Sequence, residues 1–569
     1  MGTSFLFPIL ITLNFFFFTL TSSSTLITDQ DALLAFKNAT VDTNGVLRNN
    51  WLTNISICDW AGVSCGLKHH RVTDLNLSNF ALYGSLTPHL GNLTFLQSLD
   101  ISSNNFTGVL PTELAKLRRL KQVNVAYNNF RGEIPRGILV NMSVLETIDL
   151  RFNKLSGKLP SDICNNTPKL KRLFLKRNQI YGKIPTSIYK CKEMEELSLS
   201  KNQFNGNIPT EIGNLSMLTL LSIYGNNLQG NIPASIFNIS LLQFVYLNDN
   251  NFSESIPTNL DNLLNLQELY LYSNNLTGEL PEELGNLANI EFLTTSFNDL
   301  LSDPIPSSIF NLSNLVILSL QQNQFSGSLP SDMGISLANL EELYLFFNRL
   351  TGEIPASITN ASQLTVIELN RNSFSGPIPH FGSLRKLETL RLWENNLTGA
   401  DSPNQELEFL SSLTNCQNLL HLEITNNPMM NGILPASIGN LSASLDAFSA
   451  SNCSIRGIIP LEIGNLTSLE VLDLSKNQLT GFIPTVGKLN QLGKLHLYDN
   501  QLQGYITHSL CQNIALLELY LDSNMLIGSI PECLGDIKSL QKVTSRQWEL
   551  RGRSSQRENS RRGRVRLVR

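Results

Sequence analysis

The chain has 569 residues, of which 42% are hydrophobic and 16% are charged, and its formal net charge is −5. It is too long for one compact core, and the small net charge argues against nucleic acid as a general partner. The Leu- and Asn-rich, Lys-poor balance favours a secreted protein, since an average soluble domain has about 25% charged residues.

An apolar run, FLFPILITLNFFFFTL, covers residues 5–20, and the small residues TSSS follow at 21–24. The run is shorter than the ~20 residues that a membrane helix needs, so it predicts a secretory signal peptide over residues 1–25. The alternative is a signal anchor. No later stretch is apolar enough to span a membrane, so the sequence predicts no membrane span in this chain.

Residues 26–71 are predicted to form a cap at the start of a repeat array. DQDALLAFKNAT (29–40) is predicted as an amphipathic helix, and Trp51 and CDWAGVSC (58–65) follow it. The short loop between Cys58 and Cys65 can be closed by a disulfide in an oxidising compartment.

A repeat occupies residues 72–545. When the chain is aligned on LxxLxLxxNxLxGxIP, the Asn recurs from Asn104 to Asn524, mostly at 24- or 25-residue steps, and Phe80 and Cys453 hold its place in two weaker copies. We count about 19 full repeats and a partial one. One step, from Asn395 to Asn427, is 32 residues long, so residues around 400–409 are predicted to bulge as a loop. A fixed period of this kind indicates a solenoid.

The repeat unit predicts an α/β solenoid, a superhelix with a parallel β-sheet on its concave face. The leucines of LxxLxL alternate inward, and the residues between them face outward. The buried Asn has a donor and an acceptor, so it can bond to backbone groups of adjacent turns. Gly then allows the bend, and Pro ends the pairing. The segment after Pro, such as EELGNL (282–287), is predicted as a short helix or 3₁₀ turn on the convex side.

Large aromatic side chains recur at the outward-facing strand positions. Exposed aromatic clusters are unusual on a surface without a partner, and Tyr, Trp and Arg are common interface anchors. We therefore predict a ligand-binding groove across residues 220–395, and the alternative is the ordinary preference of aromatic residues for strands. The candidate residues are Tyr224, Phe244, Tyr246, Tyr270, Tyr272, Phe292, Tyr344, Phe346, Arg391 and Trp393.

A basic patch lies at matching positions of neighbouring repeats. It consists of Arg151, Lys176, Arg177 and Lys201, with Lys171 and Arg172 beside it. Stacked like charges repel, so the patch is predicted to receive an anionic group of a ligand, such as acidic side chains. The alternative is a solvated face.

Glycosylation sequons recur along the chain and, in repeats 2 to 15, avoid the concave strand positions. Glycans would then leave the inner sheet bare, although NNLT and GNLS belong to the repeat consensus, so part of the pattern arises by default. The main candidates are Asn92, Asn105, Asn214, Asn275, Asn311, Asn396 and Asn465.

The remaining cysteines and the histidines indicate no catalytic or metal site. No CxxC motif occurs, and none of the seven histidines forms HExxH or the spacing of a catalytic triad. The sequence therefore predicts no cofactor and no metal. Cys453 is expected to be a buried thiol, whereas pairing of Cys164 with Cys191 and of Cys511 with Cys533 stays open.

The last segment, residues 546–569, has nine Arg, no Lys and no repeat phase. Arg-rich tails can bind nucleic acid, but the abrupt change of composition favours translation outside the original reading frame. Without a visible cap, the last turn of the array is predicted to fray.

The motifs DALLAFK, CDWAGVSC and HHRVTDLNLSNFALYGSLTPHLGNLTFLQSLDISSNNFTG, together with the LxGxIP repeat, resemble the extracellular part of plant leucine-rich-repeat receptor kinases. The likeness covers residues 1 to about 545 and is strongest to the immune-type subfamily of the flagellin and elongation-factor-Tu sensors. It implies an extracellular peptide or protein ligand, a co-receptor kinase with a short leucine-rich-repeat ectodomain as a possible partner, and a role in defence signalling. It also implies the secretory pathway and the extracellular space, or the plasma membrane for a full-length receptor.

In that family a membrane helix and a Ser/Thr kinase follow the repeats. We find no GxGxxG loop, HRD or DFG here, so this polypeptide is not predicted to be an enzyme. Two alternatives stay open, namely a truncated record of a membrane receptor Ser/Thr kinase and an inhibitor of a secreted pathogen enzyme.

Overall fold

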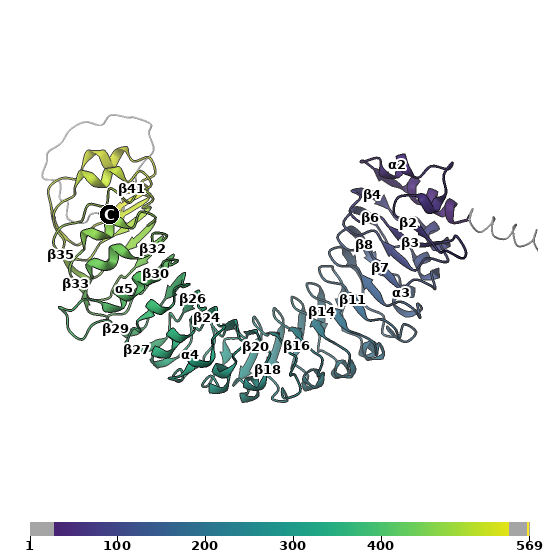
Figure 1. Cartoon of the computed structure of the whole chain (residues 1–569), viewed down its shortest axis with the longest axis horizontal. Helices are drawn as coiled ribbons and strands as arrows, with labels where there is room; N and C mark the ends of the chain where they lie inside the picture. Colours follow the sequence, from purple (N-terminus) through teal and green to yellow (C-terminus); the bar gives the residue numbers. More distant parts are fainter. Residues whose placement is uncertain (1–27, 545–565, 568–569) are drawn as a thin grey trace, which may run out of the picture. The chain divides into compact units, whose positions relative to one another are not determined.

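The structure, a computed structural model, describes residues 28–544 and 566–567 (Figure 1). The predicted signal peptide and almost all of the Arg-rich tail lie outside the described residues. The chain divides into two compact units, residues 1–275 (unit 1) and 276–569 (unit 2), and each is described by itself.

The start of unit 1 packs a helix onto the first repeat. The helix covers residues 28–39, and α2 (Val46–Asn50), η1 (Ile57–Asp59) and two short strands, β1 (Thr40–Asp42) and β2 (Val63–Cys65), follow it. Trp51 and Trp60 are buried and stack with their ring centroids 5.2 Å apart. Asp29, which is fully buried, forms an ion pair of 2.6 Å with Arg71 and also accepts a hydrogen bond from the backbone N–H of Val72. These contacts attach the helix to the first strand of the array.

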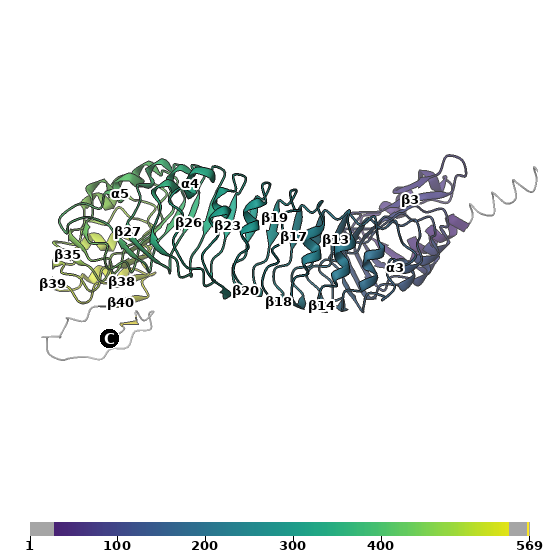
Figure 2. The same ribbon diagram turned by 90° about the horizontal axis from the view of Figure 1, so that it is seen from below.

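The inner sheet of unit 1 is parallel, and each strand comes from one repeat. Antiparallel pairing of β2 with β3 closes its first edge. Leucines at alternate positions are buried beneath it, whereas the residues between them face solvent on the concave face. Figure 2 shows β13, β17 and β19 in one row of strands, in which β15 lies between β13 and β17. The strands are β3 (Val72–Asn76), β5 (Ser98–Asp100), β7 (Gln122–Asn124), β9 (Thr147–Asp149), β11 (Arg172–Phe174), β13 (Glu196–Ser198), β15 (Leu220–Ser222), β17 (Phe244–Tyr246) and β19 (Glu268–Tyr270).

Unit 2 repeats the same arrangement. Its inner strands again pair in parallel with their sequence neighbours. The strands are β21 (Phe292–Thr294), β23 (Ile317–Ser319), β24 (Glu342–Tyr344), β26 (Val366–Glu368), β28 (Thr389–Arg391), β30 (His421–Glu423), β32 (Ala447–Ser449), β34 (Val471–Asp473), β36 (Lys494–His496), β38 (Glu518–Tyr520), β40 (Lys542–Thr544) and β41 (Arg566–Leu567). The predicted solenoid with a parallel sheet is confirmed.

The residues after most of the repeat Asn residues form additional parallel sheets on the flank, which the sequence pattern did not predict. In unit 1 the flank strands are β4 (Leu82–Ser85), β6 (Asn105–Gly108), β8 (Asn129–Glu133), β10 (Lys154–Ser156), β12 (Tyr181–Gly182), β14 (Gln203–Gly206), β16 (Asn227–Gly230) and β18 (Asn251–Glu254). The next, β20 (Asn275–Gly278), begins at the last residue of unit 1. In unit 2 they are β22 (Leu300–Leu301), β25 (Thr351–Glu353), β27 (Ser373–Pro377), β29 (Asn396–Thr398), β31 (Gly432–Ile433), β33 (Ile455–Ile458), β35 (Gln478–Thr480), β37 (Gln503–Tyr505) and β39 (Met525–Ile527).

The convex segments are mostly 3₁₀ turns that begin after Pro, because Pro fixes φ near the value that such a turn needs. Pro111, for example, precedes η3 with φ −64°. In unit 1 they are η2 (Pro88–Asn92), η3 (Thr112–Lys116), α3 (Arg136–Val140), η4 (Thr186–Lys190), η5 (Thr210–Asn214) and η6 (Ala234–Asn238). In unit 2 they are η7 (Glu282–Asn286), η8 (Ser307–Asn311), α4 (Met333–Ser336), η9 (Ala356–Asn360), η10 (Phe381–Ser383), α5 (Glu408–Ser412), η11 (Leu413–Asn415), η12 (Ala436–Asn440), η13 (Leu461–Asn465), η14 (His508–Gln512) and η15 (Glu532–Asp536). The long step after Asn395 forms turns over residues 401–405 and then α5.

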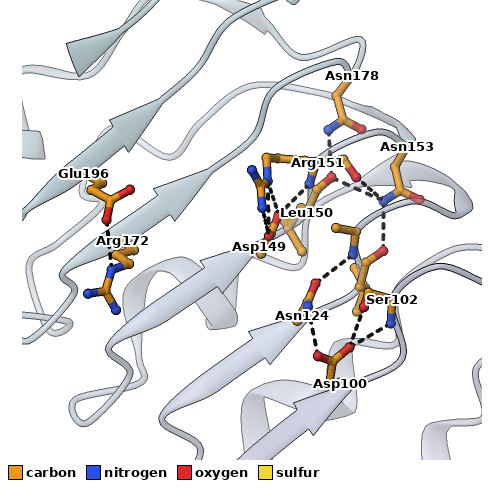
Figure 3. Close-up of polar contacts among 12 residues, drawn as sticks. Asp100, Ser102, Asn124, Asp149, Leu150, Arg151, Asn153, Arg172, Asn178 and Glu196 are labelled. Atoms are coloured by element: carbon orange, nitrogen blue, oxygen red, sulfur yellow. Dashed lines mark hydrogen bonds and ion pairs between the residues drawn. The ribbon is translucent and has the colours of Figure 1, made fainter. Parts of the chain in front are cut away.

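The repeat Asn side chains join neighbouring turns. Asn128 accepts a hydrogen bond from the backbone N–H of Phe106 in the preceding repeat at 2.9 Å and donates to the carbonyl of Ile101 at 3.0 Å. Figure 3 shows the same bond from Asn178 to the carbonyl of Leu150, 2.9 Å long. Cys453 occupies this place in its repeat, and its buried thiol donates to the carbonyl of Ile424. The Asn side chains thus replace backbone hydrogen bonds that the tight turns cannot make.

One repeat of unit 2 departs from this pattern. Thr295 stands where other repeats have a buried leucine, and among the described residues its hydroxyl has no hydrogen-bond partner. The amide oxygen of Asn323, in the next repeat, is also without a donor in the described structure. This part of the array therefore has less apolar packing and fewer hydrogen bonds than its neighbours.

The described residues contain three disulfides. Cys58–Cys65 is the bond predicted for the N-terminal cap, and Cys164–Cys191 and Cys511–Cys533 are the two pairings that the sequence could not decide. The second and third each join the convex segments of adjacent repeats. Cys416 and Cys453 are buried free thiols, and burial raises their pKa to about 11 and about 12. Three disulfides fit a protein of the secretory pathway.

Candidate functional site

A cluster of aromatic side chains lies on the concave face of unit 1, and we call its five members, given below, the tyrosine cluster. Val245 and Leu269 are fully buried, so the residues on either side of them in β17 and β19 face solvent. Ring centroids are 6.5 Å apart for Phe244 and Tyr246, and 5.0 Å apart for Tyr246 and Tyr270. The rings therefore shield one another and leave a half-buried aromatic surface. The members are Tyr224, Phe244, Tyr246, Tyr270 and Tyr272.

The phenols of this cluster are held by a carboxylate. The hydroxyl of Tyr246 donates a hydrogen bond of 2.8 Å to Glu268, and Glu268 lies opposite Phe244 in the register of β17 with β19. Burial, followed by this hydrogen bond, raises the pKa of Tyr246 well above its usual value. Burial and the charge of Glu268 raise the pKa of Tyr270 to about 12. Both phenols are therefore neutral near pH 7, and because the single O–H of Tyr246 is donated to Glu268, its oxygen remains as a hydrogen-bond acceptor.

Within the predicted basic patch, Arg151 is already paired. Its guanidinium contacts Asp149 of β9 at 2.6 Å, as Figure 3 shows, and the hydrogen bond to Asp149 raises the pKa of Arg151. Beside it, Arg172 bonds to Glu196 at 3.2 Å, also drawn in Figure 3, and to Glu195 at 3.3 Å. Lys171 pairs with Glu195 as well.

The other three members of the patch contact aromatic rings instead of carboxylates. The ammonium groups of Lys176 and Lys201 lie 5.2 and 5.7 Å from the ring centroid of Tyr224, and the guanidinium of Arg177 lies 5.3 Å from that of Phe152. Within residues 28–544, none of the three has a carboxylate within ion-pair distance. The patch therefore adjoins the tyrosine cluster through Tyr224.

Unit 2 has an aromatic group of its own, which we call the Trp393 cluster: Phe346, Phe347, Arg371 and Trp393. The rings of Phe347 and Trp393 meet edge to face at 6.3 Å. The guanidinium of Arg371 lies over both rings, 4.3 and 5.3 Å from their centroids, and bonds to Glu394. This arrangement presents a stacked cation and an indole ring, which are frequent anchors in interfaces.

The remaining predicted residues of unit 2 are bound to carboxylates or stand apart from this cluster. Arg391 bridges Glu368 at 2.5 Å and Glu423 at 3.0 Å. The hydroxyl of Tyr344 donates to Glu342 at 2.9 Å, and burial together with this bond raises the pKa of Tyr344. Phe292 lies half-buried on β21, opposite Ile317 of β23. The ten predicted ligand residues thus fall into separate groups within the two units.

Sequence reasoning missed the carboxylates Glu268 and Glu342 and the stacked Arg371. Each lies at a strand position or turn that the repeat alignment places beside a predicted aromatic residue, so reading residues column by column across repeats would have found them. A further group, His496 with Glu518 at 3.2 Å and Tyr520 stacked at 4.4 Å, lies on β36 and β38.

All seven candidate glycosylation sites are exposed. Asn92, Asn214, Asn311 and Asn465 end 3₁₀ turns on the convex side, and Asn105, Asn275 and Asn396 begin flank strands. Glycans at these positions would not cover the concave strands.

Over the described part of the chain, no group of His, Cys, Asp and Glu is placed to hold a metal ion. Nor does any helix there combine the length and apolar character needed to cross a membrane.

Comparison with known proteins agrees with this geometry. Residues 26–66 match the leucine rich repeat N-terminal domain, and the leucine-rich-repeat family matches residues 95–117, 144–166, 193–215, 241–263, 265–287, 339–361 and 468–488. The crystal structure of the Arabidopsis receptor kinase HAESA ectodomain, in complex with a peptide hormone ligand, superposes with a TM-score of 0.75 at 29% identity, covering 92% of this chain and 94% of that one. The crystal structure of PEPR1 with AtPEP1 gives a TM-score of 0.70 at 30% identity, covering 91% and 82%.

The repeats, the N-terminal domain and the concave sheet define a plant-type leucine-rich-repeat ectodomain. Among curated proteins, the receptor-like serine/threonine-protein kinase EFR of Arabidopsis thaliana is 40% identical over 80 residues, which are 14% of this chain and 8% of that protein. The sequence matches to curated relatives therefore span a small part of their length. The chain belongs to the family of leucine-rich-repeat ectodomains of plant receptor kinases.

Proposed function

We propose that this chain recognises an extracellular peptide on the concave face of unit 1, and that it acts by binding and not by catalysis. The observation that carries the proposal is the tyrosine cluster, in which aromatic rings are held half-buried by one another and by Glu268. Preorganised aromatic side chains bind peptides at a low entropic cost, because little side-chain freedom is lost on binding. The peptide ligands in the HAESA and PEPR1 structures support this class of ligand.

The proposal extends to signalling. Relatives such as EFR are receptor kinases, and a solved HAESA complex also contains the co-receptor SERK1. We propose that the ligand-bound ectodomain joins a co-receptor kinase with a short leucine-rich-repeat ectodomain, in defence signalling at the plant cell surface. The Trp393 cluster and Tyr344, Arg391 and Phe292 are proposed as further ligand contacts within unit 2, and the exposed sequons as glycan sites that leave the concave strands accessible.

The test is a selection of binders from a displayed random dodecapeptide library with the secreted, glycosylated chain as bait. Binding of the selected peptides should fall at least about tenfold when Tyr246 and Tyr270 are both replaced by Ala, since buried aromatic anchors are worth ~2 kcal/mol or more. Tyr181→Ala and Tyr505→Ala, on exposed flank tyrosines, are the matched control. Equal affinity of the folded Tyr246→Ala/Tyr270→Ala variant for every selected peptide would refute the site.

A further inference from the structure

We infer that Lys176, Arg177 and Lys201, arranged around Tyr224 and Phe152, form a subsite for carboxylate side chains, so that the peptide ligand has an acidic segment next to an apolar or aromatic residue. This inference rests on the proposed function and specifies the chemistry of its ligand.

The three cations come from two consecutive repeats on one edge of the concave face, where the two lysines converge on Tyr224 and Arg177 lies against Phe152 of the preceding repeat. Lys176 follows β11 and Lys201 follows β13, while Tyr224 follows β15 in the next repeat. Both ammonium groups lie within cation–π distance of the same ring, at 5.2 and 5.7 Å. Cation–π attraction to the shared ring of Tyr224 holds the two ammonium groups close together, although their positive charges repel each other.

The carboxylates of the surrounding strands are engaged elsewhere. Asp149 is bonded to Arg151, and Glu195 and Glu196 are bonded to Lys171 and Arg172. Further along the same edge, Asp249 accepts a hydrogen bond from Asn248, two repeats beyond Lys201. The fold therefore neutralises Arg151, Lys171 and Arg172, whereas Lys176, Arg177 and Lys201 form no ion pair in the described structure. An anionic ligand would relieve the repulsion that remains among these three cations.

The position of the subsite also limits the peptide. Neighbouring strands are ~4.8 Å apart, and an extended peptide advances ~3.3 Å per residue. Tyr246 and Tyr270 lie one and two strands beyond Tyr224. An extended ligand that places carboxylates on the lysines therefore places a residue on the tyrosine cluster about two to four positions away. Peptide carboxylates fit this geometry better than a single small anion, because the cations are spread over more than one repeat.

The experiment uses the same library selection with three forms of the secreted chain. In the patch variant, Lys176, Arg177 and Lys201 are all replaced by Gln. In the matched control, Lys154, Lys158 and Lys183 of the flank are replaced by Gln, which removes the same charge from the same part of unit 1. One selected acidic peptide and its counterpart with Asn and Gln in place of Asp and Glu are then measured by fluorescence anisotropy at low and at physiological salt.

We expect pools selected by the wild type and by the control to be enriched in Asp and Glu two to four positions from an apolar or aromatic residue, and the patch variant to lose this enrichment. The acidic peptide should bind the patch variant about tenfold more weakly than the wild type, with a smaller difference at higher salt. The neutral counterpart should bind all three forms alike.

Three results would separate the acidic subsite from the proposed function. If the selected peptides are neutral yet depend on Tyr246 and Tyr270, the acidic subsite is wrong and the proposed function stands. If acidic peptides bind the patch variant as tightly as the wild type, the subsite is likewise wrong. If no peptide of any charge is enriched, or none depends on the tyrosines, the proposed function and the inference built on it both fall.

Discussion

Replacing Asn128 by Ala would remove one rung of the Asn array in unit 1 without changing the concave face. The side chain is 7% exposed and bonds to four backbone groups, the N–H of Phe106 and the carbonyls of Ile101, Val125 and Ala126. The variant therefore isolates what one rung contributes to the coupling of two neighbouring repeats.

The magnitude follows from which groups lose their only partner. The carbonyl of Ile101 also accepts from Asn104, that of Val125 from Asn153, and that of Ala126 from the N–H of Ser103. Only the N–H of Phe106, a fully buried residue, is left without an acceptor. An orphaned buried donor costs about 1–3 kcal/mol, so we expect a local loss of ~2 kcal/mol.

Hydrogen exchange followed by mass spectrometry is the suitable assay, because repeat arrays do not unfold in a single step. The amides around Phe106 should exchange roughly 30-fold faster in the variant, which corresponds to ~2 kcal/mol. Asn129→Ala is the control, since the side chain of this neighbouring Asn is half-buried and, among the described residues, bonds only to the side chain of Asn105. A change of less than about threefold at Phe106, or equal changes in both variants, would refute the reasoning that the array depends on these amides.

Three further predictions concern groups in the cap, the tyrosine cluster and the core. Asp29→Asn should leave the guanidinium of Arg71 buried and unpaired and loosen the N-terminal helix by about 3 kcal/mol, seen as faster proteolysis before residue 76, whereas Asp31→Asn on the exposed side should not. Because the pKa of Tyr270 is raised to about 12, its contribution to stability is complete below the ordinary value near 10 and is lost as the pH rises from there through about 12. The pKa values of Tyr246 and Tyr344 are raised as well, so absorbance titration should show several late-ionising tyrosines and one fewer in Tyr270→Phe. Cys416 and Cys453, with pKa values of about 11 and about 12, should resist alkylation at pH 8 until the protein is unfolded, and labelling of the native chain within minutes would contradict their burial.

The repeat spacing was sufficient to predict the inner sheet, because the alternation of leucines at LxxLxL fixes which residues face inward. It also placed Asn128 and its equivalents in the core, since a buried amide must be satisfied and only adjacent turns offer partners. The flank sheets escaped prediction because their strands lie in the xLxG part of the repeat, where a single buried side chain, such as Phe106 of β6, gives no alternation. These strands depend on pairing with the neighbouring repeat.

The candidate site was predicted only in part, because side-chain partners depend on register. Nothing local to Tyr246 indicates that its hydroxyl bonds to Glu268, which is 22 residues away in sequence and lies diagonally opposite on the neighbouring strand β19. Likewise, Arg151 and Lys176 look alike in the alignment, yet Asp149 precedes Arg151 by two residues and neutralises it, whereas Phe174 holds that position before Lys176. Whether the cation at this repeat position forms an ion pair thus depends on one residue, which is Asp149 in one repeat and Phe174 in the next.

The disulfides have a consequence for how the protein is made. Their cysteines are 7, 22 and 27 residues apart, so none of them joins segments more than about one repeat distant. A chain that enters an oxidising compartment N-terminus first can close each bond as soon as the next repeat has emerged, before a competing thiol arrives. Cys416 and Cys453 are meanwhile enclosed by their own repeats, which removes them from thiol exchange. We expect oxidative maturation to keep pace with synthesis and to require little disulfide isomerisation.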